Sequence, residues 1–401
     1  MTTTTTTTAR GDKKFPVIGY VLAAVALLLL PHVLQYFGNA WVRIADLALL
    51  YVLLALGLNI VVGYAGLLDL GYVAFYAVGA YLFGLMASPH LSEAFPAFQA
   101  MFPDGLHVSL WFIIPLAAVV AAVAGALLGA PTLKLRGDYL AIVTLGFGEI
   151  VRIFLNNLDH PINLTNGPKG IGQIESVKFF GLDLGKRLTI GDYDISSVTL
   201  YYYLFLALVV ISVIICSRLA DSRIGRAWMA IREDEIAAKA MGINTRNLKL
   251  LAFGMGASFG GVSGAMFGAF QGFVSPESFS LMESVMIVAM VVLGGIGHLP
   301  GVILGAVLLS ALPEVLRYVA GPLQQMTDGR LDASILRQLL IALAMIVVML
   351  LRPRGLWPAP DRGKVLRDSP AAEGPGHVHP GVHSPADALP GDASRPMSIN
   401  S

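Results

Sequence analysis

The residues of this sequence that could contact a solute chemically are the ionisable side chains inside its apolar stretches. Glu149 and Arg152 lie three residues apart in the apolar run 138–157, so on a helix they share one face. Ionisable groups are costly in lipid and usually face a partner or a water-filled cavity. Two interpretations stay open for this pair: a structural ion pair, or a pair that lines a path for a small solute.

A second polar position lies at Asp69 and Tyr72, close to Gly66 and Gly71 and shortly after Tyr64. The glycines predict that the helix of this apolar stretch is broken or re-enters the membrane. Backbone groups freed in a broken membrane helix can bind the amine or carboxylate of a small zwitterion. The predicted path residues are Tyr64, Asp69, Tyr72, Glu149 and Arg152.

The charged segment Asp221–Leu250 lies between two long apolar runs and predicts a docking surface for a partner. We expect one short helix to begin at Asp221 or Ser222. We expect a second to begin at Asp234 and to end at Gly242. Asp and Ser side chains accept hydrogen bonds from the free amides of a first turn, and glycine adopts the left-handed conformation that ends a helix.

The second short helix is amphipathic. Glu235 and Lys239 are four residues apart on its polar side, where they can form an ion pair. The alternative interpretation of the whole segment is a solvated loop with two surface helices. The residues that we expect to contact the partner are Arg226, Arg232, Glu235, Ala237, Ala238 and Gly242.

Two catalytic patterns occur in the sequence by chance. Gly256–Gly260 matches the Gly-x-Ser-x-Gly pattern of serine hydrolases, but it lies in a continuous apolar run that leaves no place for a strand, turn and helix. Gly181–Arg187 begins like a phosphate-binding loop, but neither Ser nor Thr follows Lys186 and the spacing is one residue short. We therefore expect no catalytic residue, no cofactor and no ATP site, and the chain is not predicted to be an enzyme.

Histidine and cysteine give no indication of a metal site. His377, His379 and His383 are separated by proline and glycine, which is typical of a flexible tail. Cys216 is the one cysteine of the chain, so it cannot form an intramolecular disulfide. We therefore expect no bound metal.

The composition is that of a membrane protein. Of 401 residues, 56% are hydrophobic and 13% are charged, whereas about a quarter of the residues of a soluble domain are charged. We predict an all-α integral membrane protein with about ten transmembrane helices of about 20 residues each, or as few as about eight because some segments are broken or re-entrant. The candidate spans are 16–36, 42–62, 66–86, 109–131, 138–157, 198–217, 250–272, 282–297, 300–320 and 334–352.

The distribution of lysine and arginine predicts the orientation. Positive charge favours the cytoplasmic side, so both ends of the chain and the charged loop 218–249 are predicted to be cytoplasmic, and loop 158–197 periplasmic. Residues 1–14 and 353–401 are polar or rich in Pro, Gly and Ser, and we expect them to be disordered tails. The membrane domain between them is residues 15–352.

Small residues recur every four positions in several spans. Such stripes let helix backbones approach closely in lipid, so we expect them to pack helices together. The expected packing residues are Gly256, Gly260, Gly264, Gly268, Gly297, Gly301 and Gly305, and Ala121, Gly125 and Gly129 form a similar stripe.

Four segments of the chain resemble a known family of transport proteins. The run Glu235–Gly242, EIAAKAMG, is similar to the coupling loop of bacterial ABC importer permeases, although Ile236 stands where that pattern has its glutamate. Three further stretches resemble the branched-chain amino acid permeases of the LivM type: 59–71, NIVVGYAGLLDLG, 137–146, GDYLAIVTLG, and 164–170, LTNGPKG. Together the resemblance extends over about residues 40 to 355.

The resemblance implies an importer subunit of the bacterial inner membrane that forms half of a path for leucine, isoleucine, valine or related amino acids. It implies a homologous second permease subunit in a heterodimer, two cytoplasmic ABC ATPase subunits and a periplasmic substrate-binding protein, and no nucleic acid. Permeases for urea or short-chain amides also resemble this chain and are the alternative for the substrate.

A stand-alone secondary transporter is the alternative from another functional class. Such a protein needs a relay of buried carboxylates or histidines, and only Asp69 and Glu149 are candidates in this sequence. Co-purification of an ATPase would separate the two classes.

Overall fold

The computed structural model describes residues 17–326, except 104, 134, 136, 180–181 and 191–192, together with 339, 342–343, 346–347, 350–352 and 355–357. Contacts divide the chain into the units Met1–Ala359 and Pro360–Ser401, and the second unit lies outside the described residues. The predicted tail 1–14, most of the tail 353–401 with its three histidines, and most of the candidate span 334–352 also lie outside them.

The described residues are mostly helical, as predicted. The helices are α1 (Val17–Phe37), α2 (Asn39–Asn59), α3 (Val73–Ala87), α4 (His90–Ala94), α5 (Pro96–Met101), α6 (Leu110–Thr132), α7 (Asp138–Asn157), α8 (Ser197–Asp221), α9 (Arg223–Glu233), α10 (Glu235–Ala240), α11 (Thr245–Gln271), α12 (Leu281–Gly294) and α13 (Leu299–Met326). A π-helical turn, Ile60–Tyr64, follows α2, and short 3-10 turns span Gly167–Lys169 and Pro276–Phe279.

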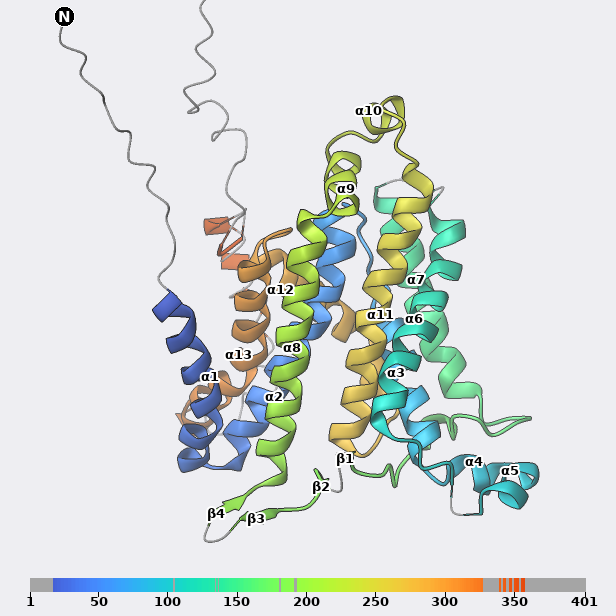
Figure 1. Cartoon of the computed structure of the whole chain (residues 1–401), viewed down its shortest axis with the longest axis vertical. Helices are drawn as coiled ribbons and strands as arrows, with labels where there is room; N and C mark the ends of the chain where they lie inside the picture. The colour runs from blue at the N-terminus through green and yellow to red at the C-terminus, as the bar shows by residue number, and fades with distance from the viewer. Residues whose placement is uncertain are drawn as a thin grey trace, which may run out of the picture. The chain divides into compact units, whose positions relative to one another are not determined.

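Two small antiparallel hairpins depart from the all-α prediction. β1 (Lys178–Phe179) pairs with β2 (Leu182–Asp183), and β3 (Leu188–Ile190) pairs with β4 (Tyr193–Ile195) in the register Leu188 to Ile195. Both hairpins lie in the predicted loop 158–197. Figure 1 shows them, with α4 and α5, at one end of the long helices, and α9 and α10 at the opposite end.

Four of the described helices are long and apolar enough to cross a bilayer: Asn39–Tyr64, Leu110–Thr132, Ser197–Asp221 and Thr245–Gln271. Shorter apolar helices cover Leu22–Phe37, Val73–Ala87, Leu281–Gly294 and Leu299–Val315. The membrane class and the helical fold are therefore confirmed, and the count of about ten spans stays a prediction.

The predicted break in the third candidate span is present. The chain leaves the π-helical turn after Tyr64 and becomes helical again at Val73. Residues 65–72 therefore form an irregular segment, which we call the α2–α3 break. A second irregular turn, 295–298, separates α12 from α13 and contains Gly295 and Gly297 at positive φ.

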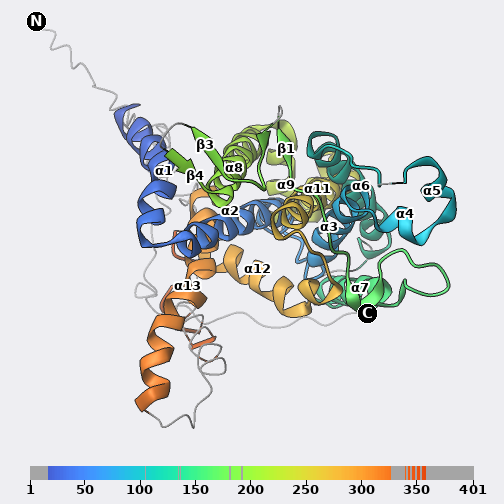
Figure 2. The same ribbon diagram turned by 90° about the horizontal axis from the view of Figure 1, so that it is seen from below.

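Helix α11 lies at the centre of the described helices and makes its most extensive contacts with α6 and α3 (Figures 1 and 2). The glycine stripe of α11 allows this approach, because a Cβ at Gly264 would overlap the backbone oxygen of Tyr76 in α3. Gly125 of α6 has the same role against Ala257, where an added Cβ would come within 2.5 Å. The stripe therefore packs helices of one chain against each other.

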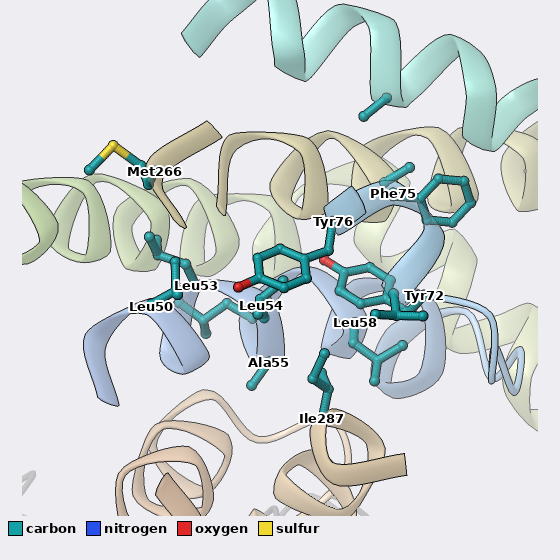
Figure 3. Packing of buried hydrophobic residues seen from close by; sticks show 14 of the residues in the cluster. Leu50, Leu53, Leu54, Ala55, Leu58, Tyr72, Phe75, Tyr76, Met266 and Ile287 are labelled. Carbon is teal, nitrogen blue, oxygen red and sulfur yellow. The ribbon is translucent and has the colours of Figure 1, made fainter. Parts of the chain in front are cut away.

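The largest hydrophobic cluster joins α2, α3, α11 and α12. Figure 3 shows leucines of α2 beside Tyr76 in the first turn of α3 and Tyr72 just before it. Ile287 of α12 lies on the side of α2 opposite the α3 ribbon. Tyr76 also packs edge-on against Phe279 at 5.1 Å between ring centroids. Gly297 does not belong to a helical stripe, which corrects the prediction. It lies in the 295–298 turn at φ +83°.

Candidate functional site

The two short helices of the charged segment begin where the sequence predicts. Ser222 Oγ accepts a hydrogen bond from the amide of Gly225 at 3.1 Å, which caps α9. Asp234 Oδ1 accepts from the amides of Ile236 and Ala237 at 2.8 and 3.0 Å, which caps α10. Gly242, at φ +84°, turns the chain out of α10.

Helix α9 packs against the end of α8 and the start of α11. Trp228 is fully buried, and its indole Nε1 donates to the carbonyl oxygen of Leu248 in α11 at 2.7 Å. Ile231, one turn later, is 4% exposed. Full burial of an apolar side chain contributes about 1.5–3 kcal/mol, so we expect α9 and the start of α11 to move as one unit.

Glu235 connects α10 to the start of α11. Its carboxylate accepts from Lys249 Nζ at 2.7 Å and pairs with Lys239 Nζ at 3.1 Å. The hydrogen bond from Lys249, more than the pair with Lys239, lowers the pKa of Glu235 to about 2. The predicted pair with Lys239 is confirmed. Lys249 was missed because it lies in the next helix, although a lysine in the first turns of an apolar helix was a usable signal.

One side of α10 is exposed and apolar. Ile236 is 73% exposed and Met241 is 83% exposed, with exposed Ala237 and Ala240 between them. We call these four residues the α10 outer face. Ala238 is 4% exposed and packs inside the chain, so it does not belong to the contact surface predicted for it. Exposed apolar patches mark contact sites more often than ordinary surface.

The two arginines predicted for this surface point to different places. Arg226 is exposed, and its guanidinium donates to the carbonyl oxygen of Asp221 at 2.9 Å. Arg232 instead reaches toward the long helices, and its Nη1 donates to the carbonyl oxygen of Gly63 in the π-helical turn. Among the predicted contact residues, Arg226, Ala237 and Gly242 are therefore exposed, and Arg226 contacts only the end of α8 among the hydrogen bonds of the described residues.

Asp69 lies in the α2–α3 break and is 1% exposed. Its Oδ1 accepts from the amide of Gly71 at 2.9 Å, while Oδ2 has no hydrogen-bond partner within the described residues. A small cavity adjoins the carboxylate. It is lined by Asp69, Gly71, Phe75, Leu128, Thr132, Thr144, Phe147 and Phe253. The break therefore presents one free carboxylate oxygen to a cavity between α3, α6, α7 and α11.

The two tyrosines predicted for the path are buried in the chain. Tyr72 is fully buried and donates to the carbonyl oxygen of Gly256 at 3.0 Å, so it joins the start of α3 to α11. Tyr64 is 2% exposed, and its hydroxyl has no partner within the described residues. In this structure Tyr72 is a packing residue, and its place in the path stays a prediction.

Glu149 and Arg152 form an ion pair with each other at 2.6 Å and do not join Asp69. Arg152 also approaches Glu277 at 3.9 Å, which connects α7 to the 3-10 turn before α12. Both side chains are about one-third exposed. The structure therefore shows the ion pair, which is one of the two interpretations left open by the sequence.

Sequence reasoning missed Tyr51 and Glu283. Tyr51 of α2 donates to Glu283 Oε1 of α12 at 2.6 Å, beside a groove between α2, α12 and α13. The signal was available, because Glu283 is the one ionisable residue in the apolar run 282–297.

Comparisons with known proteins agree with this architecture. A family model described as a branched-chain amino acid transport system permease component matches residues 40–350. The chain is 42% identical over 351 residues to the high-affinity branched-chain amino acid transport system permease protein LivM of Escherichia coli K12, covering 84% of this chain and 75% of the relative. The Salmonella typhimurium LivM protein is 43% identical, covering 79% and 70%.

A second kind of permease protein is also similar. The E. coli K12 protein LivH, named as a permease of the same transport system, is 24% identical over 334 residues, covering 82% of this chain and 98% of the relative. No solved structure matches the chain significantly.

Proposed function

The chain belongs to the family of branched-chain amino acid transport system permease components, and from that membership we propose that it is the membrane-spanning permease subunit of an ATP-driven importer for leucine, isoleucine, valine or related amino acids. The similarity to LivM proteins over most of both chains carries the proposal. These relatives are named for branched-chain amino acids, which favours that substrate class over urea or amides.

The α9–α10 unit is the proposed docking element for a cytoplasmic ATPase subunit. The α10 outer face offers an apolar surface at one end of the long helices. Small side chains such as Ala237 and Ala240 let a helix seat deeply in a groove, where its apolar residues provide most of the contact. Two ATPase subunits would serve two permease subunits, and the second permease is proposed to resemble LivH.

The opposite end is proposed to face the periplasm and to receive the substrate-binding protein. It carries α4, α5 and the two hairpins (Figure 1). With α9 and α10 in the cytoplasm, the positive-inside rule places both tails there too, which requires an even number of crossings. About ten spans and a position in the bacterial inner membrane complete the proposal.

Asp69 is the proposed polar contact of the path in this subunit. A carboxylate with a free oxygen at a break in the membrane helices can accept a hydrogen bond from the ammonium group of an amino acid when the break opens. The closed cavity in this structure is small, so such a contact requires movement of α3 relative to α7 or α11.

Reconstitution tests the proposal. The permease, its partner permease, the ATPase subunits and the binding protein are placed in lipid vesicles, and uptake of labelled leucine is measured with ATP and with a non-hydrolysable analogue. We expect uptake that requires ATP and the binding protein. Equal uptake by the permease pair alone would contradict an ATP-driven importer.

A further inference from the structure

Arg232 occupies the last turn of α9 and reaches away from the docking side. Its Nη1 donates to the carbonyl oxygen of Gly63, and its aliphatic stem lies against Gly66, where an added Cβ would lie 2.7 Å from Arg232 Cγ. Gly66 is at φ +70°, so the chain turns under the arginine. The docking helix is therefore joined directly to the beginning of the α2–α3 break.

The turn between α12 and α13 meets the same place. The amide of Gly297 donates to Asn59 Oδ1 at 2.9 Å, and an added Cβ at Gly297 would lie 2.9 Å from Arg232 Nη1. Glycine is required there both by the contact and by φ +83°. We call Arg232, Asn59, Gly63 and Gly297 the junction, in which α9, the end of α2 and the 295–298 turn are in mutual contact.

The junction stabilises a backbone that lacks a full set of internal hydrogen bonds. Where α2 passes into the π-helical turn, the amide of Ala65 reaches back to Ile60 O at 3.3 Å and that of Leu67 to Val61 O at 3.1 Å. The carbonyls at the end of a helix need an external donor, and an arginine supplies one. Gly63 O receives its hydrogen bond from another element, so its position depends on where α9 lies.

From the break, hydrogen bonds lead deeper into the membrane domain. The amide of Leu70 donates to Thr144 Oγ1 of α7 at 3.1 Å, and Leu70 O accepts from Ser284 Oγ of α12 at 2.5 Å. Asp69 lies next to Leu70 and contacts the small cavity described above. A displacement of the break would therefore change the surroundings of Asp69 and the position of α12 relative to α7.

We propose that Arg232 is a positioning residue that transmits movement of the docked α9–α10 unit to the α2–α3 break and the 295–298 turn, so that ATP hydrolysis opens or closes the path next to Asp69. The proposal rests on the proposed function as an importer subunit. It assigns the guanidinium of the exposed Arg232 to a contact with the membrane helices and leaves ATPase contact to the α10 outer face. The guanidinium of Arg232 donates to Gly63 O and lies against Gly297, and its stem lies against Gly66, so the side chain has contacts that an ordinary surface charge lacks.

The test compares Arg232→Ala, Arg232→Lys and, as the matched control, Arg223→Ala in the complete complex. Arg223 begins the same helix and is exposed, so its loss removes the same charge from α9 without touching the junction. Retention of the ATPase subunits, ATP hydrolysis and leucine uptake are measured on the same vesicles. We expect Arg232→Ala to retain the ATPase and to hydrolyse ATP while the number of leucines imported per ATP falls at least about tenfold.

Arg232→Lys should recover a large part of the number of leucines imported per ATP, because an ammonium group can also donate to Gly63 O. Arg223→Ala should leave that number as in the parent.

A cysteine at the exposed Leu68, in a Cys216→Ala background, reports the movement of the α2–α3 break directly. ATP should change the labelling rate of this cysteine in the parent complex and not in the Arg232→Ala complex. If Arg232→Ala does not insert, Gly297→Ala, which crowds the same guanidinium, carries the test with the same expected fall.

Two results would overturn the proposal. In the first, the Arg232→Ala complex imports as many leucines per ATP as the parent, and ATP changes its Leu68 labelling as it does in the parent. In the second, the Arg232→Ala complex loses the ATPase and the ratio is normal in what remains. Failure of the proposed function is a different outcome, because the parent complex itself would then show no ATP-dependent uptake.

Discussion

At the scale of single residues, Glu235 illustrates how a local expectation and a tertiary contact combine. The sequence predicts its pair with Lys239, which is one turn away, and misses Lys249, whose side chain arrives from α11 and is largely buried. Spacing along a helix can be read from sequence, whereas a partner fourteen positions away depends on how α10 folds back. The exposed helix caps were predictable for the same reason, because Ser222 and Asp234 act on amides two or three residues away.

Glu235→Gln should loosen α10. The change leaves Lys249, which is 9% exposed, with a neutral amide oxygen in place of its carboxylate partner, and a hydrogen bond to a charged group contributes about 1.5–3 kcal/mol. We expect faster hydrogen exchange of the α10 amides, measured by mass spectrometry in detergent. Glu233→Gln, at an exposed position of α9, is the control and should leave these rates unchanged.

The same contact predicts a pH dependence. The pKa of Glu235 is lowered from 4.5 to about 2 in the folded protein, so its stabilising effect is complete above about pH 4.5 and is lost as the pH falls toward 2. The protection of the α10 amides in the parent, meaning the intrinsic exchange rate at each pH divided by the measured rate, should therefore fall across that window, and that of Glu235→Gln should fall less. Equal acid sensitivity of both proteins would contradict this role of Glu235.

At the scale of helices, some glycines allow two helices to approach closely and others end a helix. In α11 they permit contact, as predicted from the four-residue spacing, but the sequence did not say that the neighbour is α3 of the same chain. Gly264→Ala should destabilise the subunit by about 1–3 kcal/mol, because its Cβ would overlap the Tyr76 backbone. Gly146→Ala in α7 is the control, since nothing lies within 4 Å of an added Cβ. Thermal melting of the purified subunit measures both.

Gly242 ends a helix, and space is not its constraint, because nothing lies within 4 Å of an added Cβ. Valine resists φ +84°, so Gly242→Val should strain the exit of α10 and tilt the α10 outer face. We expect weaker retention of the ATPase subunits and uptake reduced by more than about half, since a left-handed conformation costs a non-glycine residue about 1–2 kcal/mol.

Asparagine tolerates the left-handed conformation better than valine, so Gly242→Asn should be close to the parent. Uptake by the Gly242→Val complex at the parent's rate would show that α10 is ordinary surface and not a docking element.

At the scale of the whole molecule, hydropathy was sufficient for the membrane class and for most helix positions, because spans must be long and apolar. It could not place the side chains of Tyr72 or Arg232, whose contacts join segments far apart in the sequence. The two hairpins were missed because strands of two or three residues carry no periodicity that a sequence can display.

The orientation is testable on the intact molecule. Single cysteines replacing Lys239 in α10 and Lys178 in β1, in a Cys216→Ala background, should react with an impermeant thiol reagent from opposite sides of the membrane. Both side chains are more than half exposed, so access is not limited by packing. Labelling of both from the same side would exclude the proposed topology.

The central position of α11 also sets the order of events during biosynthesis. Its neighbours α2, α3 and α6 leave the ribosome first, and α11 covers Gly79 and Gly125 in the folded chain. A nascent chain that has reached α8 therefore holds its earlier helices in lipid with these faces unpaired. The contacts of α11 with these helices can form only when residues 245–271 enter the membrane, so we expect the packing of α3 and α6 to be completed late in synthesis.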